Sequence, residues 1–308
     1  MKNEFSFPSK DGQTSIHAIE WSPEGEKKAV LQLCHGMVEY IDRYDSFARY
    51  LTEQGFVVVG NDHLGHGSSV IDEKHRGYFD SKMGNEYVIG DIHHLRKLTR
   101  EKYPDLPYFI LGHSMGSFLV RQYIELHGEG LAGAVVMGTG IQPAVVLAGG
   151  RAMCRLIALF HGWFYRSRLI DNMAFGSYNK RFEPARTPND WLTRDEKIVD
   201  AYIEHPWTGF CFTVSAYNQM FRGMQFVQDR ENLKRLDQSL PILMVSGADD
   251  PVGDYGKGVE KVYNMYRDYG MKDVKMKLYP SDRHEILNEI DKETVYKDIL
   301  DWMNEKLS

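Results

Sequence analysis

The chain has 308 residues, a formal net charge of -6, 43% hydrophobic residues and 26% charged residues, an ordinary composition for a globular protein. The negative balance, with no basic stripe, argues against nucleic-acid binding. The three cysteines, Cys34, Cys154 and Cys211, are too few and too scattered for a disulfide framework, and the first residues lack a signal-peptide pattern. We therefore expect a cytoplasmic protein. No spacing of metal ligands stands out, so no metal and no other cofactor is expected.

Alternation of apolar and polar residues at the N-terminus predicts a β-hairpin, with a turn near Gly12. Short apolar runs then alternate with stretches of helical periodicity, which is typical of a mostly parallel sheet with helices on both faces. The predicted strands cover residues 29–34, 56–60, 108–112, 134–138, 241–246 and 274–279. The clearest predicted helices lie near 42–54, 85–103, 115–127, 255–269 and 292–306.

About one hundred residues separate the strand that ends at Gly138 from the strand that begins at Pro241, far more than an ordinary crossover needs. We interpret residues 141–225 as an inserted helical cap, and residues 1–140 and 226–308 as the core, with a helix near 226–238. The uncharged stretch from Leu131 to Gly150 is long enough for a membrane span, but it contains five glycines and Pro143, and we interpret Ala134-Val135-Val136-Met137 within it as a buried strand.

The segment Gly112-His113-Ser114-Met115-Gly116 reads G-x-S-x-G and lies between a predicted strand and a predicted helix. This context is typical of a nucleophile elbow, where a tight turn holds the serine hydroxyl above the edge of the sheet. Small residues two positions before and after Ser114 allow the strand and the helix to approach. Ser114 is therefore the candidate nucleophile, and His113 is interpreted as a packing residue.

A serine nucleophile needs a base, and the base needs an orienting carboxylate. In elbow-type enzymes these follow the serine in the order acid, then histidine. Asp249 and Asp250 follow one predicted strand, and His284 follows another. The acid and the histidine are therefore both expected beyond the carboxyl ends of the strands, where such sheets bind ligands. We choose Asp250 over Asp249 because the proline after it imposes extended geometry.

Two backbone N–H groups should stabilise the negative charge that develops on the substrate oxygen. One is the N–H of Met115, at the start of the helix after the elbow, where unpaired donors favour an anion. The second is the N–H of Met37, in the turn after the strand 29–34, where Gly36 lets the backbone bend inward.

These motifs, with His35-Gly36-Met37-Val38-Glu39-Tyr40, Arg43-Tyr44, Asp62-His63-Leu64-Gly65-His66-Gly67-Ser68, Gly247-Ala248-Asp249-Asp250 and Arg283-His284-Glu285, resemble the monoglyceride lipase and lysophospholipase branch of the α/β-hydrolases, a group of serine aminopeptidase-like hydrolases. The resemblance spans nearly the whole chain and also supports Asp250, since the branch places its acid three residues after the glycine. It implies a serine hydrolase that cleaves carboxylic esters of single-chain lipids through a Ser-His-Asp acyl-enzyme mechanism. The branch's well-known lipases carry smaller residues where this chain has Met37-Val38, so we expect a narrower acyl pocket.

The region 141–225 is rich in aromatic and methionine side chains and carries ten Lys and Arg against seven Asp and Glu. We expect most of these apolar residues to form the cap's own core and a few to line an acyl pocket. The expected partner is a small-molecule or lipid ester, with transient membrane-surface contact through the cap. Two alternatives stay open: an aminopeptidase of the proline-iminopeptidase type, and a non-catalytic binding protein on the same fold.

Overall fold

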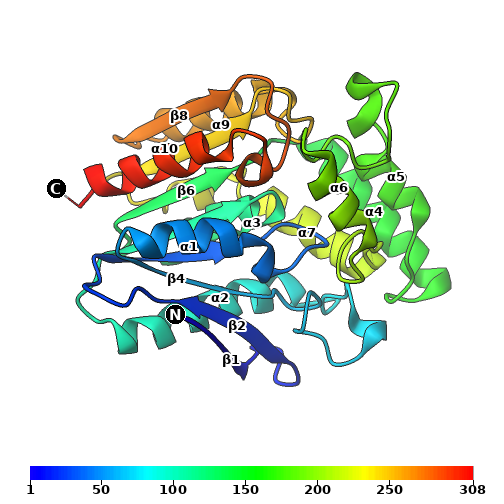
Figure 1. The fold of residues 1–308 in the computed structure, drawn as a ribbon. Coiled ribbons are helices and arrows are strands. Elements are labelled where there is room, and N and C mark those ends of the chain that lie inside the picture. The colour runs from blue at the N-terminus through cyan, green and yellow to red at the C-terminus, as the bar shows by residue number, and fades with distance from the viewer. Residues whose placement is uncertain (308) are drawn as a thin grey trace.

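The computed structural model describes residues 1–307, and these form a three-layered molecule around one eight-stranded sheet (Figure 1). The strand order is β1-β2-β4-β3-β5-β6-β7-β8. The strands β1 and β2 form the antiparallel hairpin, β2 pairs antiparallel with β4, and all later pairs are parallel. The strands are β1 (Lys2–Pro8), β2 (Ser15–Trp21), β3 (Ala29–Cys34), β4 (Phe56–Asn61), β5 (Tyr108–His113), β6 (Gly133–Met137), β7 (Ile242–Gly247) and β8 (Val274–Tyr279). The predicted hairpin and all six predicted strands are confirmed within one residue at each end.

The six strands from β3 to β8 differ in burial in the way their sequences predict. Every residue of β3, β4, β5, β6 and β7 is buried, as expected for strands with a helical layer on each face. The edge strand β8 instead alternates partly buried residues with the exposed Lys275 and Lys277. Exposed lysines on an edge strand discourage pairing with another chain.

Two hydrophobic cores cover the two faces of the sheet. On one face, α1 (Asp45–Glu53) and α10 (Lys292–Glu305) pack side chains such as Phe47 and Trp302 against the strands. On the other face, α2 (Gly84–Lys102), α3 (Met115–His127) and α9 (Lys257–Asp268) contribute side chains such as Val120 and Val262. In Figure 1, α1 and α10 lie in front of the sheet and α2 lies behind it.

Four of the five α-helices between β6 and β7 lie within residues 144–226. They are α4 (Ala144–His161), α5 (Arg168–Phe175), α6 (Glu196–Glu204) and α7 (Val214–Phe226), and they gather at one end of the sheet (Figure 1). The helix α4 packs along α7, but most of its surface is exposed. By length and composition alone α4 could cross a membrane, and only 17% of it is buried.

The predicted helix over 226–238 is wrong for most of its length. Only the single turn α8 (Arg230–Leu233) is helical there, and its N-terminus is capped by Asp229, which accepts from the N–H groups of Glu231 and Asn232. The chain then turns, because the Asp237 carboxylate binds the backbone N–H and the hydroxyl of Ser239 instead of leaving the backbone to a helix. The short 3₁₀ helices are η1 (Ile41–Tyr44), η2 (Glu73–His75), η3 (Tyr178–Phe182) and η4 (Ile286–Asn288).

Candidate active site

Ser114 lies in the sharp turn between β5 and α3, with φ of 54° and ψ of -119°. This is a strained conformation for a residue with a side chain, and such strain concentrates at functional sites. The flanking glycines make it possible. A Cβ atom on Gly112 would lie 2.1 Å from the Gly116 carbonyl oxygen, and one on Gly116 would lie 2.0 Å from the Cys34 oxygen. The turn therefore holds the serine where the strand and the helix nearly touch.

The structure brings Asp250 and His284 together from the ends of β7 and β8. The Nδ1 atom of His284 lies 3.0 Å from Oδ2 of Asp250, and both residues are buried. Asp250 also accepts hydrogen bonds from the Ser246 hydroxyl at 3.1 Å and from the Val252 N–H at 2.9 Å. Asp249 is instead partly exposed, with Arg181 3.8 Å from its carboxylate. Of the two adjacent acids, only Asp250 is bonded to the histidine.

Ser114 and His284 line a common cavity of about 300 Å³ beneath the inserted helices. Met37, one predicted oxyanion donor, also lines this cavity, and Val38 beside it has a positive φ of 51°. The other predicted donor, Met115, is not among the residues that line this cavity, and its side chain is buried in the hydrophobic core. The remaining lining residues are Gly36, Val38, Glu39, His113, Asp171, Asn172, Phe175, Gly176, Pro188, Asn189, Trp191, Leu192, Tyr202, Gly209, Phe210 and Glu285.

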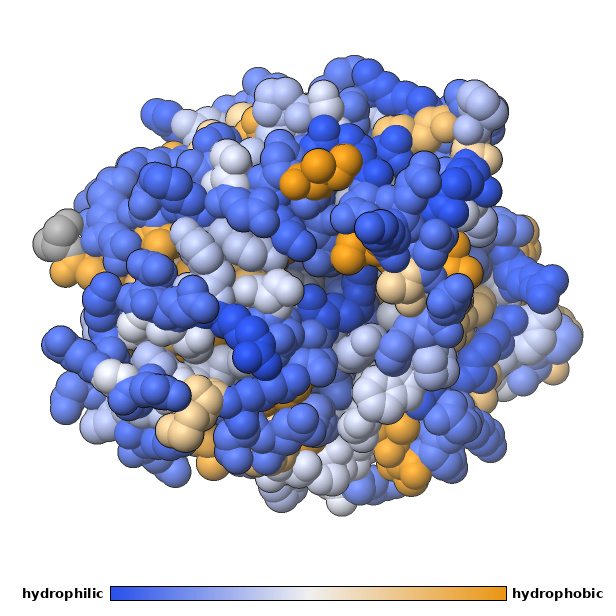
Figure 2. Space-filling model, in the orientation of Figure 1, coloured by the Kyte–Doolittle hydropathy of each residue, from blue (hydrophilic) through white to orange (hydrophobic). Residues whose placement is uncertain are grey.

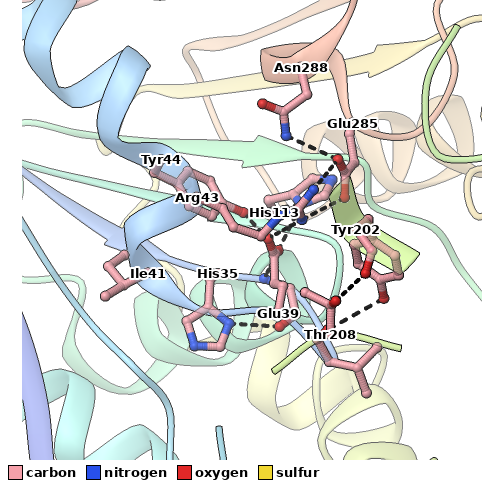
Figure 3. A network of polar contacts seen from close by, with 12 residues as sticks. His35, Glu39, Ile41, Arg43, Tyr44, His113, Tyr202, Thr208, Glu285 and Asn288 are labelled. Carbon is pink, nitrogen blue, oxygen red and sulfur yellow. Dashed lines mark hydrogen bonds and ion pairs between the residues drawn. The ribbon is translucent and has the colours of Figure 1, made fainter. Parts of the chain in front are cut away.

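A buried ion network links Glu39, in the turn after β3, to Glu285, in the loop after β8, through Arg43 (Figure 3). The guanidinium of Arg43 bonds Glu39 at 2.7 Å and Glu285 at 2.7 and 2.8 Å. Glu39 in turn accepts from the Gly36 N–H at 2.5 Å and from the Tyr44 hydroxyl at 3.0 Å. Burial alone would raise the pKa of the Glu39 carboxyl. The hydrogen bond with His113 and the charge of Arg43 outweigh burial and hold that pKa well below its usual range.

His113, interpreted above as a packing residue, belongs to the same network. Its Nδ1 lies 3.4 Å from Glu39 Oε1 and 3.2 Å from the Tyr44 hydroxyl, and its Nε2 lies 3.2 Å from the carbonyl oxygen of His284. Burial lowers the pKa of His113, but the neighbouring Glu39, Glu285 and the His284 carbonyl raise it further than burial lowers it. His113 therefore links the elbow to the backbone of His284 through polar contacts.

Sequence reasoning missed Glu39, Arg43 and Glu285 as parts of the site. Arg43 and Glu285 are 242 positions apart in the sequence. A pair separated by that many residues leaves no periodic or spacing signal in a single sequence. The one available sign was local, because Glu39 and Arg43 are four residues apart and of opposite charge.

Within residues 1–307, one set of three carboxylates is close enough to hold a metal ion: Asp282, Glu289 and Asp291. Arg194 already lies among them. Its Nη2 is 2.5 Å from both Asp282 and Asp291, and its Nε is 2.9 Å from Glu289. Because the chain supplies its own cation at this position, we assign no metal to it.

Comparison with solved structures defines the class of protein. A carboxyl esterase from Bacillus coagulans superposes with a TM-score of 0.93 at 32% identity, over 100% of this chain and 99% of that one. A structure described as a lipase in its open form gives a TM-score of 0.86 at 25% identity, over all of both chains. The fold is that of an α/β-hydrolase.

Residues 25–291 match the model of the Hydrolase_4 family, described as serine aminopeptidase S33, and the chain belongs to this family. A monoacylglycerol lipase from Mycolicibacterium smegmatis is 26% identical over 98% of this chain and 97% of its own length. A mouse monoglyceride lipase is 26% identical over 97% of this chain and 89% of its own. The resemblance drawn from the motifs is confirmed: the protein is a carboxylic ester hydrolase of the monoglyceride lipase branch.

Proposed function

We propose that the protein hydrolyses carboxylic esters of single-chain lipids through an acyl-enzyme on Ser114. The observation that carries this proposal is that Ser114 and His284 line one cavity while Asp250 is bonded to the histidine. Three features are therefore connected. These are the strained turn at Ser114, the imidazole of His284, and the Asp250 carboxylate bonded to that imidazole at 3.0 Å. A base oriented by a carboxylate, in the same cavity as a partly exposed serine, is the arrangement that acyl transfer requires.

In this mechanism the Ser114 hydroxyl oxygen attacks the ester carbonyl carbon, and Nε2 of His284 takes its proton. Nε2 has this role because Nδ1 is engaged with Asp250. Asp250 keeps the imidazole in the required tautomer and stabilises its charged form. The histidine then donates the proton to the leaving alcohol. A water molecule attacks the acyl-enzyme in the same way, which releases the acid and restores Ser114.

The negative charge on the carbonyl oxygen would be held by the backbone N–H groups of Met37 and Met115. The N–H of Met115 is in the first turn of α3, where helix geometry leaves donors without an intrahelical acceptor. Met37 follows Gly36, whose N–H is fixed by Glu39. The loop is thus set before substrate arrives, which is the condition under which such donors stabilise a transition state most.

The cavity supports a substrate with one acyl chain. Its volume of about 300 Å³ is at the lower end of the range for small-molecule sites. Apolar side chains such as Met37, Phe175 and Phe210 share its wall with Asn172 and Asn189, which suits a hydrocarbon chain next to a polar glycerol or phosphoglycerol group. The monoacylglycerol and monoglyceride lipases among the relatives favour the same substrate class.

We also propose that residues 141–225 act as a cap that selects the acyl chain, while 1–140 and 226–308 form the catalytic core. The lining residues of the cavity divide in this way. Ser114 and His284 come from loops next to the sheet, whereas Asp171, Asn172, Phe175 and Gly176 come from α5 and the residue after it. We expect the enzyme to work in the cytoplasm, where the free thiols of Cys34, Cys154 and Cys211 would stay reduced.

The cap's outer surface supports transient contact with a membrane. Large apolar side chains are exposed there, and they show at the edge of the molecule where α4 and α5 lie (Figure 2). Exposed arginines such as Arg155 and Arg168 flank them, and α4 contains no acidic residue. An apolar surface with cationic neighbours fits a lipid interface that contains anionic headgroups. The exposed apolar residues are Val145, Val146, Leu156, Leu159 and Phe160 on α4, and Leu169 and Met173 on α5.

Aminopeptidase activity is the less favoured alternative, although the family's description contains that word. It would need a free carboxylate in the cavity to hold the substrate ammonium group. The three acidic side chains that line the cavity are all engaged: Glu39 and Glu285 with Arg43, and Asp171 with the Tyr217 hydroxyl at 2.5 Å.

The test is hydrolysis of p-nitrophenyl esters, combined with labelling by a fluorophosphonate, which reacts with activated serines. Ser114→Ala should lose the label and lower kcat by roughly 10⁴-fold or more, because the nucleophile is absent. Ser117→Ala is the matched control: it changes a neighbouring serine whose hydroxyl bonds the Ser114 carbonyl, and it should stay labelled. Turnover near the wild-type rate in folded Ser114→Ala would overturn the proposal, and so would a wild-type protein that fails to react with the probe, as a pure binding protein would.

A further inference from the structure

The segment Asp190–Arg194, which we call the strap, lies before α6 and runs alongside the loop Asp282–Glu289 that carries His284. The strap's backbone accepts the N–H groups of His284 and of the residue that follows it. The bonds join the His284 N–H to the Trp191 oxygen at 3.4 Å, the Glu285 N–H to the Leu192 oxygen at 2.7 Å, the Arg283 guanidinium to the Asp190 oxygen at 2.5 Å, and the Thr193 hydroxyl to the Asn288 oxygen at 3.0 Å.

Arg194 is the charged end of the strap. Its side chain binds Asp282, two residues before His284, and Glu289, five residues after it. Glu289 Oε1 also accepts the backbone N–H of Arg194 at 3.1 Å and that of Arg283 at 2.9 Å. Both carboxylates are buried. Arg194 therefore binds the loop on both sides of His284.

The strap also contacts the imidazole itself. The ring of Trp191 lies with its centroid 5.1 Å from that of His284, and the His113 ring lies 4.6 Å from it. Tyr178, from η3, packs on Trp191 at 4.9 Å. The strap thus supports the ring of His284 as well as its backbone.

We propose that Arg194 is a positioning residue that fixes His284 against Asp250 and so makes the placement of the base depend on the inserted segment. This inference rests on the proposed function, because it takes His284 as the base. Arg194 touches no reacting atom. It acts through Asp282, Glu289 and the strap, which together leave the loop little freedom.

The geometry of the guanidinium matters as well as its charge. One planar fork contacts three carboxylates, whereas the single ammonium of a lysine cannot reproduce these directed bonds. The cluster is also short of positive charge. Oδ2 of Asp282 is buried without a hydrogen-bond partner in the described chain, and burial together with Glu289 and Asp291 raises the pKa of Asp282. Removing the arginine would leave buried carboxylates uncompensated, which is strongly destabilising.

The experiment compares Arg194→Lys and Arg194→Gln with wild type. Arg194→Lys keeps the charge and should keep the fold, so it remains informative if Arg194→Gln does not fold. The matched control is Arg186→Lys, in the same inserted segment, where the arginine bonds Asp200 and makes no contact with the His284 loop. The measurements are kcat and KM on a p-nitrophenyl acetate substrate, the rate of fluorophosphonate labelling, and the proton NMR resonance of the His284 Nδ1–H.

We expect Arg194→Lys to lower kcat and the labelling rate by between ten- and a hundredfold with KM nearly unchanged, since small misplacements of a catalytic group cost about this much. The Nδ1–H resonance should shift or broaden, and Arg186→Lys should match wild type in every measurement. Wild-type kcat in Arg194→Lys, or a loss confined to KM, would overturn the inference. His284→Ala is measured in parallel. If it stays active, the proposed mechanism has failed; if it is inactive while Arg194→Lys is normal, only the role of Arg194 has failed.

Discussion

Asp249 and Asp250 are neighbours with identical side chains, and their surroundings give them different roles. Asp250 is fully buried, with both oxygens engaged by His284, Ser246 and the Val252 N–H. Asp249 is partly exposed and faces Arg181. At the residue scale, the turn after β7 therefore directs only one of two equal carboxylates inward, toward His284.

Asp250→Asn should lower kcat by about 10⁴-fold, because an amide at this position favours the wrong histidine tautomer. Asp249→Asn should leave kcat within a few-fold of wild type. Steady-state kinetics on a short ester, with circular dichroism to verify folding, measures both. A larger loss in Asp249→Asn than in Asp250→Asn would reverse the assignment.

Glu39 connects the Gly36–Met37 turn, the proposed oxyanion turn, with the ion network. Glu39→Gln keeps the shape but removes the charge that faces Arg43, so we expect kcat to fall by roughly tenfold to a hundredfold as the Gly36–Met37 turn loses its support. The pKa of Glu39 is depressed in the folded protein. Its ionisation therefore stabilises the fold above the unfolded-state pKa of about 4.3, and that stability is lost as the pH falls below this value.

Thermal unfolding between pH 3 and 7 measures the stability effect of Glu39→Gln. The variant should be less stable than wild type near pH 7, and the difference should shrink below about pH 4, where the unfolded carboxyl binds a proton. Glu4→Gln is the control, because Glu4 is an exposed acid that does not line the cavity. A stability difference that grows on acidification would contradict the depressed pKa.

At the element scale, the sheet was predictable because its strands are buried on both faces. The apolar run Tyr108-Phe109-Ile110-Leu111, directly before the elbow, is typical of a buried strand. Asp250 follows the buried strand β7, and His284 follows the partly exposed edge strand β8. The order of elements therefore placed Ser114, Asp250 and His284 at one edge before any distance was known.

Other parts of the site could not be predicted, since they depend on contacts between distant segments. Arg43 contacts Glu285 because the carboxyl ends of β3 and β8 lie at the same edge of the sheet. Arg194 contacts Asp282 because the segment between β6 and β7 folds over that edge. The helix expected over 226–238 failed for a local reason. The Asp237 side chain binds the Ser239 backbone and favours a turn, a competition that apolar periodicity does not register.

The inserted helices contribute the wall of the cavity, and α5 is the element to test. Phe175, the last residue of this helix, lines the cavity. We expect kcat/KM to rise with acyl length by several-fold per methylene, about 0.8 kcal/mol each, until the cavity is full. Phe175→Ala should shift the acyl length at which kcat/KM stops rising to longer chains. It should leave turnover of the acetate ester nearly unchanged.

The measurement for Phe175→Ala is kcat/KM over a series of p-nitrophenyl esters from acetate to long-chain acids. Tyr165→Ala is a matched control, because Tyr165 lies in the same insert, stacks with His161 and does not line the cavity. A flat length profile, or equal losses on acetate and long-chain esters, would show that the insert does not select the chain.

At the scale of the whole molecule, the apolar side chains of α4 and α5 all belong to the insert that covers the cavity. The side chains of Leu159 and Phe160 are 78% and 74% exposed, and Phe175, at the end of α5, reaches the cavity wall. A molecule that rests on a lipid surface through this side would present its cavity to substrates in that surface.

The double variant Leu159→Ser/Phe160→Ser should weaken binding to vesicles that contain anionic phospholipids, because each apolar side chain withdrawn from water contributes about 1.5–3 kcal/mol. Sedimentation with vesicles of phosphatidylcholine and phosphatidylglycerol measures the bound fraction. Hydrolysis of a water-soluble acetate ester should be unchanged, since neither residue lines the cavity, whereas hydrolysis of monoacylglycerol held in vesicles should fall several-fold. The control Ile71→Ser/Ile290→Ser removes two exposed apolar side chains outside the insert. If it reduced vesicle binding as much as the α4 variant, the contact would not belong to the cap.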